Sequence, residues 1–139
     1  MAYPEILHHG AVGGVTGSCH ELRVGDDDAI LIDCGLFQGA ENSGEGAGAD
    51  NLAIEFPIER VRALVVTHVH IDHVGRIPYL IAAGFRGPIY CSLPSARLLP
   101  VVQRPSRSTA SSATVRALPA ARRSVIPTST MMTGCGAVT

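Results

Sequence analysis

The chain has 139 residues, the size of one domain, and combines 46% hydrophobic and 17% charged residues with a net charge of −1. These values exclude a uniformly basic nucleic-acid-binding protein and an acidic disordered chain. It has no run of eighteen apolar residues and its N-terminus does not resemble a secretion signal, so we expect no membrane segment. Its four cysteines are far apart and form no Cys-x-x-Cys pair, which predicts reduced thiols and a cytoplasmic location.

The first sixty residues predict an antiparallel meander followed by an irregular segment. Three short apolar stretches, 5–9, 18–24 and 29–34, are separated by turn-forming residues, as in consecutive hairpin strands. Residues 38–51 are rich in Gly, Glu and Asn and predict a long polar loop. A short helical turn is expected at 57–60.

The next forty residues predict a strand–helix–strand unit. The apolar, β-branched run 61–67 is typical of a strand that is covered on both faces. Apolar residues at helical spacing predict a helix over 74–83, short or bent because Pro78 lies in its early turns, with Gly84 as its cap. Two more elements are expected, a strand at 88–92 and the start of a helix at 95–99. Together the elements predict an α/β fold of the α+β type, with a mixed sheet and flanking helices.

Charge divides the chain into two unlike parts. All twelve acidic residues lie at or before Asp72, whereas residues 73–139 contain eight arginines and no acid. Residues 101–139 also lack histidine, lysine and aromatic residues, and no helical or alternating period persists there. We therefore divide the chain into a folded part at 1–100 and an irregular or disordered basic tail at 101–139. Two alternatives remain open for this tail, a product of a shifted reading frame and a contact surface for RNA.

One short motif, Thr67-His-Val-His-Ile-Asp-His73, places four possible metal ligands directly after the apolar run 61–66. His68 and His70 alternate along an extended segment, so they can face the same side, and Asp72 and His73 follow in the turn into the helix. A lone histidine in a strand is usually packed or solvated, but four such residues at this spacing indicate metal binding. Imidazole and carboxylate ligands suit zinc, and also manganese or iron. Two such ions can activate water and clamp a phosphoryl centre during hydrolysis.

The motif resembles the HxHxDH signature of the metallo-β-lactamase superfamily. Three further segments resemble the β-CASP RNA-processing branch, which includes relatives of the cleavage and polyadenylation specificity factor nuclease: Gly10-Ala-Val-Gly-Gly-Val-Thr-Gly-Ser-Cys-His20, Leu31-Ile-Asp-Cys-Gly-Leu-Phe-Gln-Gly39 and His73-Val-Gly-Arg-Ile-Pro-Tyr-Leu80. The resemblance covers residues 5–100. It implies that this region is the N-terminal half of an αββα sandwich.

The resemblance also implies roles for individual residues. His68 and His70 would hold a first zinc ion, and Asp72 and His73 a second. Asp72 and Asp33 are the candidate catalytic residues: Asp72 would orient the attacking water, and Asp33, at the end of an early strand, would support the metal-binding loops. The implied reaction is cleavage of RNA phosphodiester bonds by a zinc-activated water.

The sequence departs from the family pattern after His73, where the family has two further histidines, a bridging aspartate and an inserted β-CASP domain. Residues 74–139 contain no histidine and no acid. We therefore expect the 139-residue chain itself to be a truncated, inactive form. Two other functions stay open, a metallo-β-lactamase-fold hydrolase of thioesters or small esters and a non-catalytic module that binds metal or RNA. The sequence gives no oligomeric state.

Overall fold

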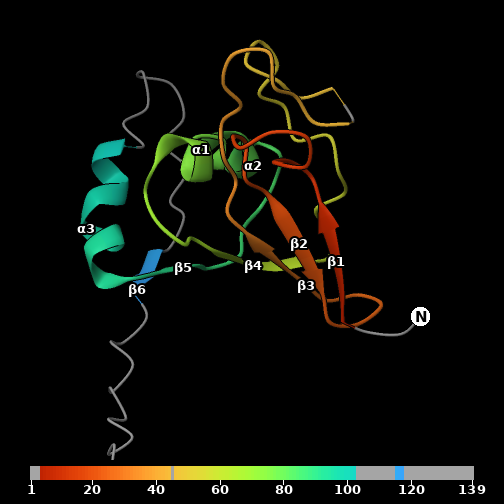
Figure 1. Ribbon diagram of the computed structural model, residues 1–139. Coiled ribbons are helices and arrows are strands. Elements are labelled where there is room, and N and C mark those ends of the chain that lie inside the picture. Colours follow the sequence, from red (N-terminus) through yellow and green to blue (C-terminus); the bar gives the residue numbers. More distant parts are fainter. Residues whose placement is uncertain (1–3, 45, 103–114, 118–139) are drawn as a thin grey trace, which may run out of the picture.

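The computed structural model describes residues 4–44, 46–102 and 115–117, and within them it contains one six-stranded sheet and three helices (Figure 1). The strands lie across the sheet in chain order: β1 (Glu5–His8), β2 (His20–Arg23), β3 (Ala29–Ile32), β4 (Val61–Val65), β5 (Ile89–Cys91) and β6 (Val115–Ala117). The helices are α1 (Ile71–Val74), α2 (Ile77–Ala82) and α3 (Leu93–Val102). The predicted mixed sheet with flanking helices is confirmed.

The sheet changes from antiparallel to parallel at β3. Strands β1, β2 and β3 pair antiparallel, which confirms the predicted meander, and β3 to β6 pair parallel. Leu31 of β3 lies opposite Leu64 of β4, and both side chains are fully buried. Burial of a leucine side chain contributes about 1.5–3 kcal/mol, so this pair fixes the register at the centre of the sheet.

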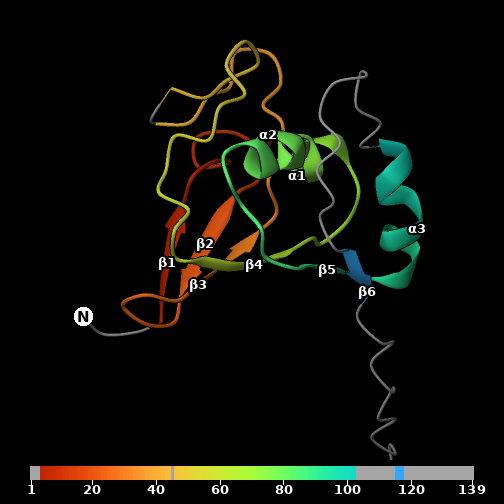
Figure 2. The ribbon, with the colours of Figure 1, turned by 180° about the vertical axis from the view of Figure 1, so that it is seen from behind.

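Two short helices replace the single bent helix expected over 74–83. Helix α1 ends at Val74, and α2 starts at Ile77 with Pro78 in its first turn, where the missing N–H of proline costs no hydrogen bond. Gly84 follows α2 with φ +113° and donates its N–H to the Ile81 carbonyl at 3.1 Å, which confirms it as the cap. Both views place α1 and α2 next to each other at one end of the sheet (Figure 2).

The last described elements lie at the far edge of the sheet. Helix α3 begins before the expected 95–99 segment and continues to Val102, and it lies beside β6 in both views. Strand β6 falls within the part expected to be irregular, where no pattern indicated a strand. The remainder of the predicted tail lies outside the described residues. None of the described helices is long and apolar enough to cross a membrane.

Two local expectations from the sequence are wrong. Strand β4 is not covered along its whole length, because Arg62 is exposed and its guanidinium Nε lies 2.7 Å from the Asp28 carboxylate. Residues 57–60 form a plain turn, closed by the Val61 N–H donating to the Ile58 carbonyl at 3.0 Å. The sheet and the helices share one core, to which Leu31, Leu64, Val66, Val74, Ile77, Leu80, Phe85, Ile89 and Leu99 contribute.

A buried carboxylate connects β1 and β2. Glu21 is 1% exposed, and it accepts hydrogen bonds from His9 Nε2 and Arg23 Nε, each at 2.8 Å. Burial alone would raise the pKa of Glu21, but the hydrogen bonds from Arg23 and His9 outweigh it and lower that pKa. The His9 ring also stacks on Phe56 at a centroid distance of 3.7 Å. His9 is therefore a packed residue.

Arg76, between α1 and α2, is fully buried and connects three segments. Its Nε donates to the Gly35 carbonyl at 2.8 Å and its Nη1 to the Ala53 carbonyl at 3.2 Å, while its guanidinium carbon lies 4.8 Å from the Phe37 ring centroid. Glu55 supplies a carboxylate 3.5 Å from Nη1. Nη2 has no hydrogen-bond partner within the described part of the chain. A single cation thus connects the loop after β3 and the segment that contains Ala53 and Glu55 to the helices.

We expect Arg76→Ala to lower the free energy of unfolding by about 3 kcal/mol or more, because it leaves two carbonyls and a carboxylate without their donor. Urea unfolding followed by circular dichroism measures the change. Arg97→Ala, at an exposed position on α3, is the matched control and should change stability by less than about 0.5 kcal/mol. A small change in the Arg76 variant would contradict this role.

Candidate metal centre

The candidate centre forms where two parallel strands end. The Asp33 N–H, just after β3, donates to the Val65 carbonyl at 2.9 Å, so Asp33 lies beside the segment that leaves β4. Asp33 is 2% exposed and has φ 59°, a left-handed conformation that side chains other than glycine, Asn and Asp rarely adopt. Contacts around the carboxylate hold it in this conformation.

Four groups converge on the Asp33 carboxylate. The Thr67 backbone N–H donates to Oδ1 at 2.8 Å, and the Thr67 hydroxyl donates to Oδ2 at 2.8 Å. The Ser18 hydroxyl donates to Oδ2 at 3.3 Å, and His73 Nδ1 lies 2.8 Å from the same oxygen. Both oxygens are therefore used by protein donors, which makes Asp33 a positioning residue.

These bonds determine which nitrogen of two histidines is available. A carboxylate only accepts, so His73 carries its proton on Nδ1 and leaves the Nε2 lone pair free. The Thr67 hydroxyl gives its proton to Asp33, so His68 Nδ1, 3.0 Å from that hydroxyl oxygen, must be the donor between them. The Nε2 lone pair of His68 is then free as well. A carboxylate behind a histidine prepares it in this way for a metal ion.

The predicted ligands come together in pairs. The His68 ring centroid lies 4.6 Å from that of His70 and 3.9 Å from that of His73. His73 Nε2 lies 3.5 Å from the Asp72 carboxylate, close enough for both to bind one ion. The donor types fit zinc, which takes histidine and carboxylate ligands. Among the described residues, however, no group of three donors is arranged to hold an ion.

Backbone contacts fix α1 against the loop after β3. The Cys34 N–H donates to the His73 carbonyl at 2.8 Å, and the Ser18 N–H donates to the Asp72 carbonyl at 2.9 Å. A Cβ atom at Gly35 would lie 1.6 Å from the Asp72 carbonyl oxygen, so only glycine allows this approach. The positions of Asp72 and His73 thus depend on both neighbouring loops.

The cysteines beside the site are core residues. Cys19, Cys34 and Cys91 are buried and free. A hydrogen bond to Cys34 and burial raise the pKa of the Cys19 thiol, and burial raises that of Cys91. Both thiols therefore stay protonated near neutral pH, which makes them poor metal ligands.

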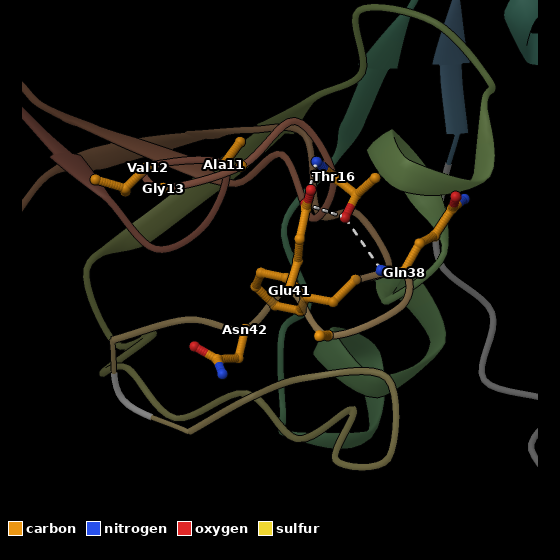
Figure 3. Close-up of a pocket in the computed structure, with 10 residues that line it drawn as sticks. Ala11, Val12, Gly13, Thr16, Gln38, Glu41 and Asn42 are labelled. Carbon is orange, nitrogen blue, oxygen red and sulfur yellow. Dashed lines mark hydrogen bonds between the residues drawn. The ribbon is translucent and has the colours of Figure 1, made fainter.

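A pocket of about 450 Å³ lies next to this region, between the loop after β1 and the loop after β3 (Figure 3). The Glu41 carboxylate accepts hydrogen bonds from the Thr16 N–H at 2.7 Å, the Val15 N–H at 3.3 Å and the Thr16 hydroxyl. The Gln38 N–H donates to the Thr16 hydroxyl oxygen at 3.0 Å. The three hydrogen bonds from Thr16 and Val15, the Thr16 hydroxyl first, lower the pKa of Glu41 and connect it to the glycine-rich loop (Figure 3).

Sequence reasoning missed three residues of the site. Thr67 and Ser18 hold Asp33, but the motifs that contain them gave no reason to separate them from their neighbours. Arg76 lies in the predicted helix and in the family-like segment at 73–80 without a role of its own, yet an arginine within an otherwise apolar helical stripe is a signal for a buried cation. His68, His70, Asp72 and His73 do lie together, as their spacing predicted.

The comparison with protein families identifies the fold. Residues 12–129 match the model described as metallo-beta-lactamase superfamily. The chain belongs to this superfamily. The metallo-β-lactamase assignment explains why two strand ends and a short helix converge on one carboxylate, and it confirms the family expected from the HxHxDH motif.

The relatives that the chain matches are named as a ribonuclease, as a transcription termination factor and as a subunit of the cleavage and polyadenylation specificity factor. The ribonuclease TTHA0252 of Thermus thermophilus is 40% identical over 97 residues, which cover 70% of this chain and 21% of that protein. The transcription termination factor FttA of Methanococcus maripaludis is 42% identical over 78 residues, 56% of this chain and 12% of that protein. Subunit 3-II of the Arabidopsis thaliana cleavage and polyadenylation specificity factor is 31% identical over 75 residues, 52% and 12% respectively. The chain thus spans about a fifth or less of these relatives.

We expect Asp33→Asn to lower the free energy of unfolding by about 1–3 kcal/mol, because the amide cannot accept all four hydrogen bonds. Asparagine tolerates the left-handed backbone, so the change isolates the hydrogen bonds from backbone strain. Urea unfolding measures the loss, with the exposed Asp50→Asn as matched control. A stability equal to that of the control would show that the network is dispensable.

We expect Glu41→Gln to open the glycine-rich loop. The glutamine carboxamide has one accepting oxygen and one NH2 donor, whereas the glutamate carboxylate has two accepting oxygens. Hydrogen exchange at the Val15 and Thr16 amides should accelerate about tenfold, while exposed Glu59→Gln leaves it unchanged. Since the pKa of Glu41 is lowered in the folded chain, the loop contact is complete above the ordinary value of 4.5 and is lost as pH falls through the lowered value. Protection factors of these two amides that change neither with pH nor with the substitution would contradict the contact.

Proposed function

We propose that this chain supplies part of the metal centre of an RNA-cleaving metallo-hydrolase. One observation carries the proposal: Asp33 holds the Nδ1 protons of His68 and His73, directly or through Thr67, so the Nε2 lone pairs of both rings are available, and His73 Nε2 lies 3.5 Å from the Asp72 carboxylate. This arrangement has no obvious value for packing, because His68, Asp72 and His73 are only partly buried. A histidine whose proton is held by a carboxylate in this way is typical of metal ligands.

The proposed roles follow from the pairs of ligands. His68 and His70 would hold a first zinc ion, and Asp72 and His73 a second, with manganese or iron as other candidates. When bound, such ions supply an activated water and neutralise charge on a phosphodiester. Asp72 would orient the water. Asp33 would keep His68 and His73 in the tautomer that binds metal, and the loops at Ser18 and Gly35 would hold α1 in place.

RNA is the proposed substrate class. The named activity of the Thermus relative supports it, as does the naming of another relative as a polyadenylation specificity factor subunit. A thioester or small-ester hydrolase would use the same ions, so the substrate has to be tested directly. The free, buried cysteines agree with the proposed cytoplasmic location.

The proposed centre needs donors that the sequence after His73 does not contain, since residues 74–139 include no histidine, aspartate or glutamate. Open sites with two protein ligands hold metal weakly. We therefore propose that the 139-residue chain alone is inactive and that turnover requires further parts of the gene product. Sequencing the coding DNA past codon 100 and translating it in all three reading frames would identify such parts.

The test is cleavage of a 5′-labelled single-stranded RNA by the longest product that the gene encodes. We expect metal-dependent cleavage that chelation abolishes and that Asp72→Asn lowers by at least ~10²-fold, because the water loses its orienting carboxylate. The matched control is Asp50→Asn, an exposed carboxylate far along the polar loop, which should leave the rate unchanged. The 139-residue chain should show no turnover.

Two results would overturn the proposal. RNA cleavage that survives the combined change of His68 and His70 to alanine would place the activity elsewhere. Hydrolysis of a thioester without any cleavage of RNA would assign the centre to the other substrate class. Metal-dependent turnover by the 139-residue chain would contradict only the expectation that this chain is incomplete.

A further inference from the structure

Two histidines outside the candidate centre lie directly opposite each other on neighbouring strands. His8 of β1 is the register partner of His20 of β2 in the antiparallel pair. Their Nδ1 atoms are 2.9 Å apart, and their rings meet edge to face with centroids 4.9 Å apart. His8 is exposed and His20 is half-buried, so the pair opens to solvent. Neither residue belongs to the HxHxDH motif.

The spacing of the two nitrogens matches adjacent positions around one metal ion. Bonds from a metal to imidazole nitrogen are about 2.0–2.1 Å, so two such bonds at a right angle place the nitrogens about 2.9 Å apart. A tetrahedral angle would separate them by about 3.3 Å. Right angles are typical of the square-planar and octahedral coordination of nickel and copper.

We propose that His8 and His20 form a two-imidazole binding site for a divalent transition metal of the nickel or copper class, separate from the His68, His70, Asp72 and His73 cluster. The pair supplies two adjacent ligands, and water would fill the other positions. Binding would add a cross-link between the last residue of β1 and the first residue of β2. The site does not depend on the proposed RNA-cleaving activity.

The surroundings of His20 favour this role. Its second nitrogen, Nε2, lies 3.4 Å from the Ser18 hydroxyl, which in turn donates to Asp33, so a polar chain fixes the ring from behind. Burial and the neighbouring His8 ring lower the pKa of His20. The imidazole is therefore neutral at pH 7, and no proton has to be displaced before a metal binds.

The opposing explanation is a simple hydrogen bond, in which one Nδ1 donates to the other. That bond would give the same distance, but it would not bind metal any better than two separated surface histidines would. Nickel affinity therefore distinguishes the two. Nickel is preferred to copper as the probe, because Cu²⁺ would also react with thiols.

The test is calorimetric titration of the full 139-residue chain with Ni²⁺ at pH 7, under conditions that keep the thiols reduced. We expect one equivalent whose affinity falls at least ~10-fold in His8→Thr and in His20→Thr, substitutions that place a strand-favouring β-branched residue at each position. The control, with both His68 and His70 changed to alanine, should keep this equivalent. Paramagnetic broadening of amide signals should centre on β1 and β2.

An unchanged nickel isotherm in His8→Thr overturns the proposal, and so does loss of the equivalent in the His68 and His70 control. His8 is exposed, so its replacement should leave the fold intact, which circular dichroism checks. Should His20→Thr unfold the chain, His8→Thr and His8→Asn decide the outcome. Failure of RNA cleavage by the gene product would leave this result unaffected.

Discussion

The Asp33 carboxylate is the interaction on which the site depends. It lies where β3 ends, in a left-handed conformation, and it receives hydrogen bonds from Thr67 after β4, from His73 of α1 and from Ser18 in the loop before β2. A buried carboxylate is costly unless its oxygens are hydrogen-bonded, and each of these contacts lowers that cost. The folding of three separate segments is therefore coupled to one charge, and the metal ligands are oriented as a result.

The backbone around Asp33 supplies the rigidity that side-chain bonds alone cannot. The loop after β3 contacts α1 so closely that the Gly35 Cα faces the Asp72 carbonyl, and Arg76 holds this loop from below through the Gly35 carbonyl. Helix α1 has only four residues, too few to hold its own geometry. Its position is imposed by neighbours, which explains why buried polar contacts are concentrated here.

Local patterns predicted the elements and the ligand cluster, but not the contacts that orient the cluster. The meander, β4, β5 and the cap at Gly84 follow from periodicity and turn residues within short windows. His68, His70, Asp72 and His73 lie within six residues, so their proximity is also local. Thr67 reaches Asp33 across 34 positions and Arg76 reaches Gly35 across 41, and no periodicity encodes such distances. The exposure of Arg62 could not be predicted for the same reason, since the composition of a strand does not show which of its residues the rest of the fold covers.

The two groups of histidines differ in how their free nitrogens are determined, and this difference limits what each can bind. At the candidate centre, Asp33 assigns the protons of His68 and His73, directly or through Thr67, and leaves the Nε2 lone pairs of both rings available. In the pair on β1 and β2, strand register brings two Nδ1 atoms together, and within the described part of the chain the Ser18 hydroxyl is the group that contacts the second nitrogen of His20. A carboxylate that fixes the tautomer increases ligand basicity and suits tight binding, whereas register alone supplies spacing. The first arrangement therefore suits an ion that stays through a reaction, and the second suits an ion that exchanges with solvent.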